Sequence, residues 1–339
     1  MSAVAGVDAS SRVSKPVIER GRRVFRRYSY AGLAYALLIG LLLISWSLES
    51  GFFSLSTLSD TLAGAAPVTI LSIAMTVPIV SGNGGVDLSV GPLVSLINVA
   101  VVTGAASGSF SGAPYVVIPI ALAMGIGSGL VNGLLIAVMR VQPIVATLGT
   151  YLMYAAFAAM ILPQTGNTAP SWLNQFAGQV GPVPGALFPI LLVLAAWLAT
   201  TRTPFYRYLY ATGDSEATAF SAGVPVTAVK LLAYMICGLF TAVGALAMTA
   251  LIGSGDATIG TPLTLTAIAG AALGGTTLAG GRGGILGSVA GGLDVYLIQN
   301  VLTITHVPAF YVTLTYGAVL VGSITVNGGL TVLFKRAQS

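Results

Sequence analysis

The sequence predicts an all-α, polytopic membrane protein with about ten transmembrane helices and with both termini in the cytoplasm. Charged residues make up only 7% of the 339 residues, whereas a soluble domain carries about 25%. Hydrophobic residues make up 55% of the chain, and they gather in stretches long enough to cross a bilayer. Lysine and arginine fall on only one side of these stretches. Together these observations make the bilayer the solvent for most of the chain.

The first apolar stretch, "YAGLAYALLIGLLLISWSL" (30–48), has the length of a spanning helix and ends near Trp46, an expected interface anchor. The later stretches lie near 60–80, 92–108, 114–139, 143–162, 186–200, 230–253, 263–279, 285–304 and 309–332. With the N-terminus inside, the basic residues beyond the first stretch all fall at cytoplasmic turns or ends; they are Arg140, Arg202, Arg207, Lys230, Arg282, Lys335 and Arg336. This asymmetry obeys the positive-inside rule.

The spans form one transmembrane domain over residues 29–334, between two polar tails. Residues 1–28 are predicted to be a disordered, basic cytoplasmic tail, and residues 335–339 a short cytoplasmic tail. The basic cluster from Arg12 to Arg27 directly precedes the first span, where positive charge fixes orientation and attracts anionic membrane lipids. The basic residues beside the membrane account for the net charge of +5. We therefore do not expect nucleic acid as a partner.

Glycines cluster within the predicted spans, as in "GIGSGLVNG" (125–133) and "GGTTLAGGRGGILG" (274–287). Small residues let membrane helices approach closely, and we predict this packing role for both stretches. The second stretch lacks the Lys-Ser/Thr ending of a phosphate-binding loop, so we do not expect it to bind a nucleotide. Any step that consumes ATP would therefore need another subunit.

The reactive side chains do not form a catalytic or metal-binding set. Cys237 is the single cysteine and lies in an apolar run, which predicts a packing role. His306 has no cysteine or carboxylate companions in the sequence. Without a Ser-His-Asp set or paired carboxylates, the chain is not expected to be an enzyme, and no cofactor or metal is expected.

Asp87 lies in "SGNGGVDLSVGP" (81–92), a polar, glycine-rich segment between two apolar spans. Two interpretations remain open from the sequence. The segment is a cytoplasmic turn in which Asp87 and Ser89 cap the next helix, or it is a broken, re-entrant element that lines a polar path. An unpaired acid in the membrane costs about 2.5–3.5 kcal/mol, so the second interpretation makes Asp87 a functional residue.

Neutral amides, chiefly Asn132 and Asn300, are other polar groups in or beside the spans. An amide both donates and accepts hydrogen bonds, which suits a hydroxylated solute better than an ion. We therefore predict a path for a small neutral polyol near Asp87, Ser89, Asn132 and Asn300; the alternative for each amide is an interhelical hydrogen bond. A rival class, the ion-coupled secondary transporter, favours buried acid–base pairs and an internal repeat, and the sequence shows neither convincingly.

Four stretches follow one another in a characteristic order. They are "GGVDLSVGP", "VNGLLIAVMRVQPIVATLGT", "RYLYATGDSEATAFSAGVPVTAVKLLAYMICGL" and "AIAGAALGGTTLAGGRGGILGSVAGG". In this order and spacing they resemble motifs of the permease family of bacterial ABC importers for ribose and related monosaccharides, which also includes autoinducer-2 permeases. The resemblance extends from about residue 52 to about residue 304, which is most of the chain.

The resemblance implies the membrane-spanning subunit of an importer in the bacterial cell (inner) membrane. Its partners would be two ABC ATPase subunits and a second permease subunit, in a homodimer or a heterodimer. A periplasmic or lipid-anchored sugar-binding protein would deliver a pentose or hexose, or alternatively autoinducer-2. The chain departs from the family pattern at Leu263-Thr264-Leu265-Thr266, where Glu-Leu-Asp is usual; this loss of acidic residues leaves the sugar specificity open.

The charged passage "YATGDSEATAFSAGV" (210–224) gains a role from this resemblance. It implies a short cytoplasmic coupling helix near 213–223 that docks in a cleft of the ATPase. We expect Asp214 or Ser215 to cap this helix and Gly223 to end it. Glu216 places negative charge in the first turn, and Ala217 allows close approach. The expected coupling residues are Gly213, Asp214, Ser215, Glu216, Ala217 and Gly223.

Overall fold

The computed structural model describes residues 31–162, 166–308 and scattered residues between 310 and 325. The long helices are α2 (Gly32–Leu48), α3 (Leu55–Val80), α4 (Val90–Ala106), α5 (Pro114–Gly133) continued by the π-helical turn η3 (Leu134–Val138), α6 (Pro143–Ile161), α8 (Leu187–Thr201), α11 (Val226–Ile252) and α13 (Ile285–Ile304). The predicted tails 1–28 and 335–339 lie outside the described residues, as does most of the span predicted near 309–332.

The shorter elements lie between these helices or at their ends. The short helices are η4 (Ser171–Leu173), α7 (Asn174–Ala177), α9 (Pro204–Asp214), α10 (Glu216–Ser221) and α12 (Leu263–Leu273). Two small antiparallel pairs join β1 (Gly166–Thr168) to β4 (Ser254–Gly255) and β2 (Gln179–Val180) to β3 (Val183–Pro184). In the first pair Gly166 lies opposite Gly255, and in the second Val180 lies opposite Val183.

Five helices are long and apolar enough to cross a membrane: α3, α5 with η3, α6, α11 and α13. Helices α8 and α9 add a sixth candidate if they count as one broken span, since they bend by 84° at their junction. Helices α2, α4 and α12 are apolar but shorter. The chain is therefore a helical, polytopic membrane protein with five or six candidate spans by length and composition among the described residues, where we predicted about ten.

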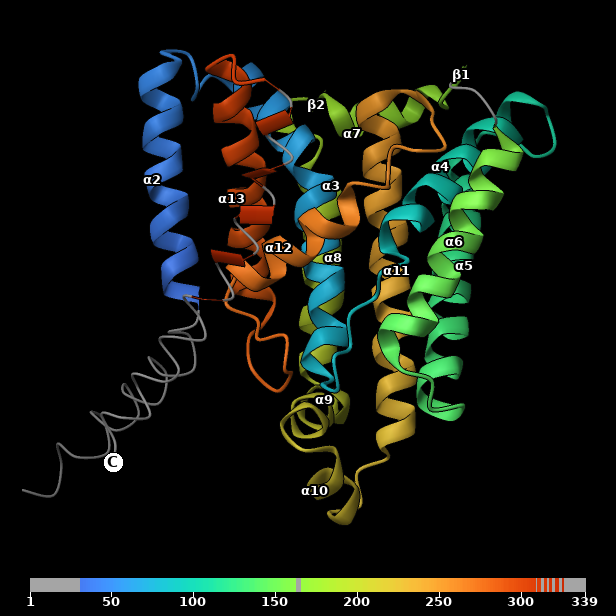
Figure 1. Cartoon of the computed structure of the whole chain (residues 1–339). Helices are drawn as coiled ribbons and strands as arrows, with labels where there is room; N and C mark the ends of the chain where they lie inside the picture. Colours follow the sequence, from blue (N-terminus) through green and yellow to red (C-terminus); the bar gives the residue numbers. More distant parts are fainter. Residues whose placement is uncertain are drawn as a thin grey trace, which may run out of the picture.

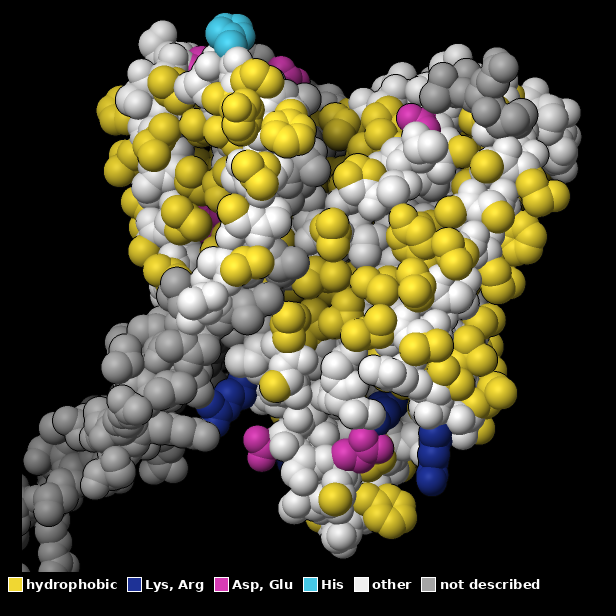
Figure 2. All heavy atoms as spheres, in the orientation of Figure 1, with side chains coloured by type: hydrophobic (Ala, Val, Ile, Leu, Met, Phe, Trp, Pro, Cys, Tyr) yellow, Lys and Arg dark blue, Asp and Glu magenta, His cyan; other side chains and the backbone are white. Residues whose placement is uncertain are grey.

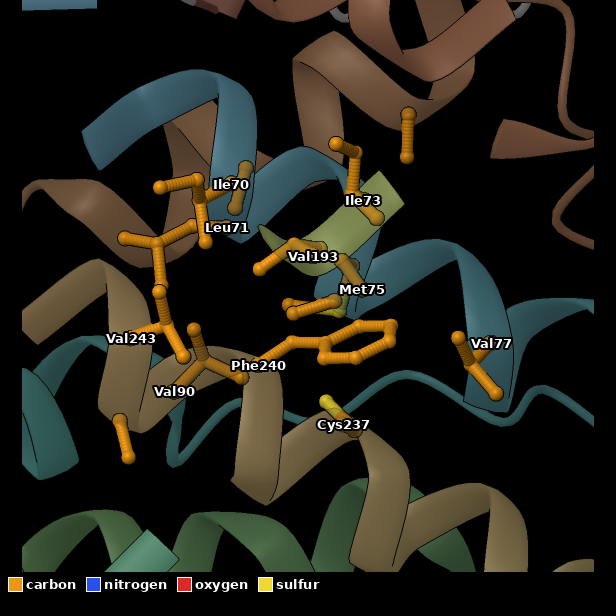
Figure 3. Close-up of a cluster of buried hydrophobic side chains, with 14 of the residues drawn as sticks. Ile70, Leu71, Ile73, Met75, Val77, Val90, Val193, Cys237, Phe240 and Val243 are labelled. Atoms are coloured by element: carbon orange, nitrogen blue, oxygen red, sulfur yellow. The ribbon is translucent and has the colours of Figure 1, made fainter. Parts of the chain in front are cut away.

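Helices α3 and α11 form the centre of the protein and pack against each other. Figure 3 shows their side chains interleaved, with Met75 of α3 close to Phe240 of α11 and with Val193 of α8 beside them. Every residue of α3 from Ala65 to Val80 is buried. Cys237 lies in the same cluster and is fully buried, which confirms its predicted packing role.

The glycine stretch 125–133 packs helix α5 directly against α11. A Cβ at Gly125 would collide with the carbonyl oxygen of Gly238, and one at Gly129 would collide with that of Tyr234. The two backbones therefore approach more closely than larger residues allow. This arrangement confirms the packing role predicted for these small residues.

Two elements enter the protein without crossing it as regular helices (Figure 1). The ascending element, residues 81–106, turns back from the end of α3, runs inward without helical structure to Ser89, and continues as α4. The descending element, residues 253–273, enters from the other end of the molecule after α11 and continues as α12. Since α3 and α11 run in opposite directions, the two elements have the same build in inverted orientation, although the sequence shows no repeat.

The descending element corrects one predicted span. We predicted a helix over 263–279, but α12 has 11 residues and ends at Leu273. At about 1.5 Å per residue it is about half as long as the hydrocarbon core is thick. The following residues, 274–284, form an irregular loop. The apolar half-helix and the Gly, Ala and Thr residues after it together have nearly the hydropathy of a full span. For this reason the sequence predicted a longer helix than the structure shows.

Charge is distributed unevenly over the surface. Figure 2 shows lysine and arginine side chains gathered at the end of the molecule that carries α9 and α10, below a broad apolar surface. The described basic residues are Arg140, Arg202, Arg207, Lys230 and Arg282. Their elements end or begin on this side, which is the distribution expected of a cytoplasmic face.

Candidate coupling helix and solute path

Helices α9 and α10 form the part of the protein that projects beyond the apolar surface (Figures 1 and 2). Helix α8 ends before Arg202 and Thr203. Helix α9 then begins at Pro204 and runs in a new direction. A proline is suited to the first position of a helix because the missing N–H would have no partner there. We predicted one helix near 213–223, and the structure instead divides this region between the end of α9 and α10.

Ser215 caps α10. The sequence predicted either Asp214 or Ser215 in this role. Its backbone is extended, and its hydroxyl accepts a hydrogen bond from the Thr218 amide at 3.3 Å. Asp214 is the last residue of α9 and does not cap α10. Glu216 occupies the first turn of α10, where the helix dipole favours negative charge.

Gly223 ends this helix in the predicted way. Its φ of +81° places it in the left-handed region, where a residue without a Cβ is favoured. The Gly223 amide donates to the carbonyl oxygen of Phe220, and the Val224 amide donates to that of Ala219. This is the Schellman pattern of hydrogen bonds, which satisfies carbonyl groups left open at the end of a helix.

The surface of α10 combines small residues with one large aromatic side chain. Ala217, Thr218 and Ser221 are exposed, whereas Ala219 is buried against the protein. Phe220 is 73% exposed. Aromatic side chains are enriched at protein–protein interfaces, which makes Phe220 a candidate contact residue. The sequence analysis did not single out Phe220, although its place in the helical passage was visible.

An ion pair ties α10 to the central helix α11. Lys230 donates to a carboxylate oxygen of Glu216. The Lys230 side chain is only 8% exposed, and that of Glu216 is 48% exposed. The short helix is therefore attached to α11 by a charged contact in addition to the chain itself. The ion pair connects α10 directly to the helix at the centre of the fold.

Three of the four predicted path residues meet in one buried hydrogen-bonded network. One Asp87 oxygen accepts hydrogen bonds from the Ser89 amide at 3.0 Å and the Ser89 hydroxyl at 2.6 Å. The Asn132 amide nitrogen lies 3.3 Å from each Asp87 oxygen and 2.9 Å from Ser89 Oγ. Thr150 of α6 completes the network by donating to the Asn132 amide oxygen at 2.8 Å. All four residues are buried.

The network bears on both interpretations of residues 81–92. Asp87 accepts from the Ser89 amide in a local turn just before α4, but Ser89 is the N-cap residue of α4 and no side chain makes the predicted capping hydrogen bond. At the same time, the segment is a broken element within the protein, and Asp87 is only 2% exposed. Its carboxylate has hydrogen-bond partners on α5 as well as on its own segment. In the described conformation these groups satisfy one another and leave little surface open.

Thr264 joins the two broken elements. Its hydroxyl donates to the carbonyl oxygen of Leu88 at 3.2 Å and accepts from the Gly91 amide at 3.1 Å. A Cβ at Gly91 would collide with the carbonyl oxygen of Gly260, so the backbones also touch. Thr264 belongs to the passage that departs from the usual Glu-Leu-Asp, and a threonine hydroxyl fulfils this bridging role with both donor and acceptor.

Asn300 lies apart from this network, near the end of α13. The structure shows it partly buried and on none of the elements that carry Asp87, Asn132 or Thr150. A second buried amide, Asn98 of α4, was missed by the sequence analysis: its nitrogen donates to Thr249 Oγ1 and to the Ser254 carbonyl, both at 3.0 Å. It fastens the descending element to α4 and α11, and no pattern in the sequence distinguishes it.

Comparisons with known proteins identify the family of the chain. A family described as the permease component of branched-chain amino acid transport systems matches residues 57–324. The chain belongs to this permease family. It is similar to the ribose import permease protein RbsC of Escherichia coli strain K12, with 32% identity over 303 residues, 86% of this chain and 91% of that protein.

Other similar members of the permease family are importers of autoinducer 2 by name. The LsrC permease of Klebsiella pneumoniae subsp. pneumoniae is 33% identical over 312 residues, which cover 90% of this chain and 88% of LsrC. LsrC of Yersinia enterocolitica is 28% identical over 314 residues, 90% of this chain and 84% of LsrC. No solved structure matches the chain. The resemblance to ribose and autoinducer-2 permeases is thereby confirmed.

Proposed function

We propose that the chain is the membrane-spanning subunit of an ATP-driven ABC importer for a monosaccharide, either a pentose or a hexose. It forms the translocation path and catalyses no reaction itself. Two ABC ATPase subunits supply energy, a second permease subunit completes the membrane complex, and a periplasmic or lipid-anchored binding protein delivers the sugar. The site of action is the bacterial cell (inner) membrane.

The exposed helix α10 carries this proposal. It lies at the end of the molecule where basic residues gather, and it presents Ala217 and Phe220 to the surroundings. Its start and end are fixed by Ser215 and Gly223, and Glu216 fixes it to α11. A short, capped and tied helix with an aromatic anchor is suited to docking in a cleft of a partner, because little ordering is needed on binding. The partner that would occupy this position is the ATPase.

The solute path is proposed to pass the broken elements, near Asp87, Ser89, Asn132 and Asn300. Irregular backbone within a membrane is tolerated where it is buried in protein or lines a cavity, and both broken elements bring such backbone inside. The network of Asp87, Ser89 and Asn132 has one of two roles. Its side chains contact the solute when the path opens, or they hold the shape of the ascending element, whose backbone contacts the solute. Selection of the sugar is left to the binding protein.

A neutral, hydroxylated solute agrees best with the polar groups inside the protein. Hydroxyl and amide groups predominate there, and Asp87 already has hydrogen-bond donors around its carboxylate. A zwitterionic amino acid, which the family description raises, would favour a buried cation as well as an anion. Lys230, a buried base at the cytoplasmic end, is engaged by Glu216. Autoinducer 2 is itself a small hydroxylated molecule and is the second candidate, favoured by the LsrC relatives.

Uptake by proteoliposomes tests this function. The vesicles should contain the permease complex with its ATPase, and the binding protein should be added outside with labelled ribose or autoinducer 2. We expect uptake only with internal ATP, and none with a non-hydrolysable analogue or without the binding protein. Uptake driven by an ion gradient in the absence of ATP would contradict the proposal and would favour the ion-coupled secondary transporter.

A further inference from the structure

Three segments that lie far apart in the sequence meet next to the coupling helix, backbone against backbone. They are the turn after α3 with Gly82, the end of α9 with Gly213, and the loop 274–284 with Gly280 and Gly281. We call these four glycines the glycine junction. The Gly281 amide donates a hydrogen bond to the carbonyl oxygen of Val80 at 3.1 Å, which fastens the loop to the end of α3.

The glycine junction leaves no room for a side chain at any of its four positions. A Cβ at Gly213 would collide with the Val80 carbonyl oxygen and would lie 2.6 Å from the Gly281 nitrogen. A Cβ at Gly82 would lie 2.8 Å from the Gly213 Cα, and one at Gly280 would collide with the Gly82 Cα. These neighbours are backbone atoms, which cannot rotate away as a side chain can.

A side-chain hydrogen bond adds a second connection between α9 and the loop. The Tyr210 hydroxyl donates to the carbonyl oxygen of Gly283 at 3.0 Å. Tyr210 lies almost one helical turn before Gly213, so α9 is attached to the loop at two successive points. The end of α9 therefore cannot tilt or shift without moving the loop.

Each segment of the junction leads directly to a functional part of the protein. Asp214 and Ser215 follow Gly213, and α10 begins at Glu216. Gly82 opens the ascending element, in which Asp87 is only five residues further along the chain. The loop 274–284 connects α12, the helix of the descending element, to α13.

We infer that the glycine junction is the contact through which movement of the coupling helix reaches both broken elements. The inference rests on the proposed function, because the ATPase supplies the movement. Contacts between backbones transmit a displacement without the freedom of side-chain rotamers, and closely packed interiors shift as units. One displacement at α10 would thus act on the ascending element at Gly82 and on the descending element through the loop.

The test compares Gly213→Ala with Gly127→Ala in the reconstituted complex of permease, ATPase and binding protein. Both residues are helical glycines, but a Cβ at Gly127 has nothing within 4 Å. Alanine favours the helix at either position, so Gly213→Ala disturbs the junction and not α9 itself. The measurements are the amount of ATPase that co-purifies, the rate of ATP hydrolysis, and the labelled sugar taken up per ATP hydrolysed.

We expect the Gly213→Ala complex to retain its ATPase and to hydrolyse ATP, while uptake per ATP falls by about tenfold or more. Gly127→Ala should match the wild type. If Gly213→Ala fails to assemble, Tyr210→Phe decides, because it removes the hydroxyl that donates to Gly283 and keeps the ring; we then expect a decrease of about two- to fivefold.

Wild-type uptake per ATP in an assembled Gly213→Ala complex would overturn the inference. The same result in Tyr210→Phe would overturn it if Gly213→Ala does not assemble. A failure of the proposed function is distinguishable, since the wild-type complex itself would then take up no sugar when ATP is supplied.

Discussion

Replacing Ala217 with tryptophan is expected to weaken binding of the ATPase by about tenfold to a hundredfold and to abolish most ATP-driven uptake. Ala217 is exposed on α10, and the proposed partner cleft closes around this small side chain. Inserting a large side chain into a packed contact costs about 1–3 kcal/mol, and about 1.4 kcal/mol corresponds to a tenfold change in affinity. The measurement is the dissociation constant of the purified permease for its ATPase, followed by uptake in vesicles.

Ala217→Ser is the matched control, because it keeps the small size at the same exposed position. It should bind the ATPase within about twofold of the wild type. Since Ala217 lies on the exposed surface of α10, neither variant should change the unfolding temperature of the membrane domain. Wild-type affinity and uptake in Ala217→Trp would place the docking surface elsewhere on the cytoplasmic end.

The second large effect is expected for Asp87→Asn, which should reduce sugar uptake about tenfold or more in a complex that still assembles. The substitution keeps the shape of the side chain, but it removes the charge that strengthens the hydrogen bonds from Ser89 and Asn132. The substitution also replaces one carboxylate oxygen with an amide nitrogen, which cannot accept the hydrogen bond from the Asn132 side chain. Loss of a hydrogen bond to a charged group costs about 1.5–3 kcal/mol, enough to shift the ascending element.

Asn300→Leu tests the remaining proposed path residue, which lies outside the network. We expect it to lower uptake with no loss of assembly, because Asn300 is only partly buried. Labelled-sugar uptake and size-exclusion profiles of both variants provide the measurement. If Asp87→Asn and Asn300→Leu both transport at the wild-type rate, these residues do not line the path, and Asp87 only stabilises the turn before α4.

Much of the architecture could be predicted because the bilayer leaves a strong signature in sequence. Apolar stretches and one-sided basic residues predicted a helical membrane protein. Local backbone chemistry predicted a cap at Asp214 or Ser215, of which the structure shows Ser215, and an end at Gly223. These features depend on short segments, or on composition, and not on which segments meet in space.

The broken elements and their contacts could not be predicted in the same way. Hydropathy does not separate α12 and the first residues of its following loop from a full span, since no charged side chain occurs before Arg282. Thr150 and Thr264 resemble many other threonines, and their roles depend on α5, α6 and the ascending element lying together. Of the four junction glycines, only Gly280 and Gly281 lie in a stretch that predicted close packing. Their partners lie more than sixty residues away in the sequence and are brought to them only by the fold.

Cross-linking from Phe220 tests the central claim most directly, because it asks what occupies the exposed surface of α10 in the working complex. Phe220→Cys would be made in a Cys237→Ala background, so that the introduced thiol is the single cysteine of the chain. A short thiol-reactive photocross-linker would be attached after purification, with Ser109→Cys, in the exposed turn after α4, as the control. We predict a covalent product with the ATPase from Phe220→Cys and none from Ser109→Cys. An assembled, ATP-hydrolysing complex in which Phe220→Cys gives no ATPase product would contradict the assignment of α10 as the coupling helix.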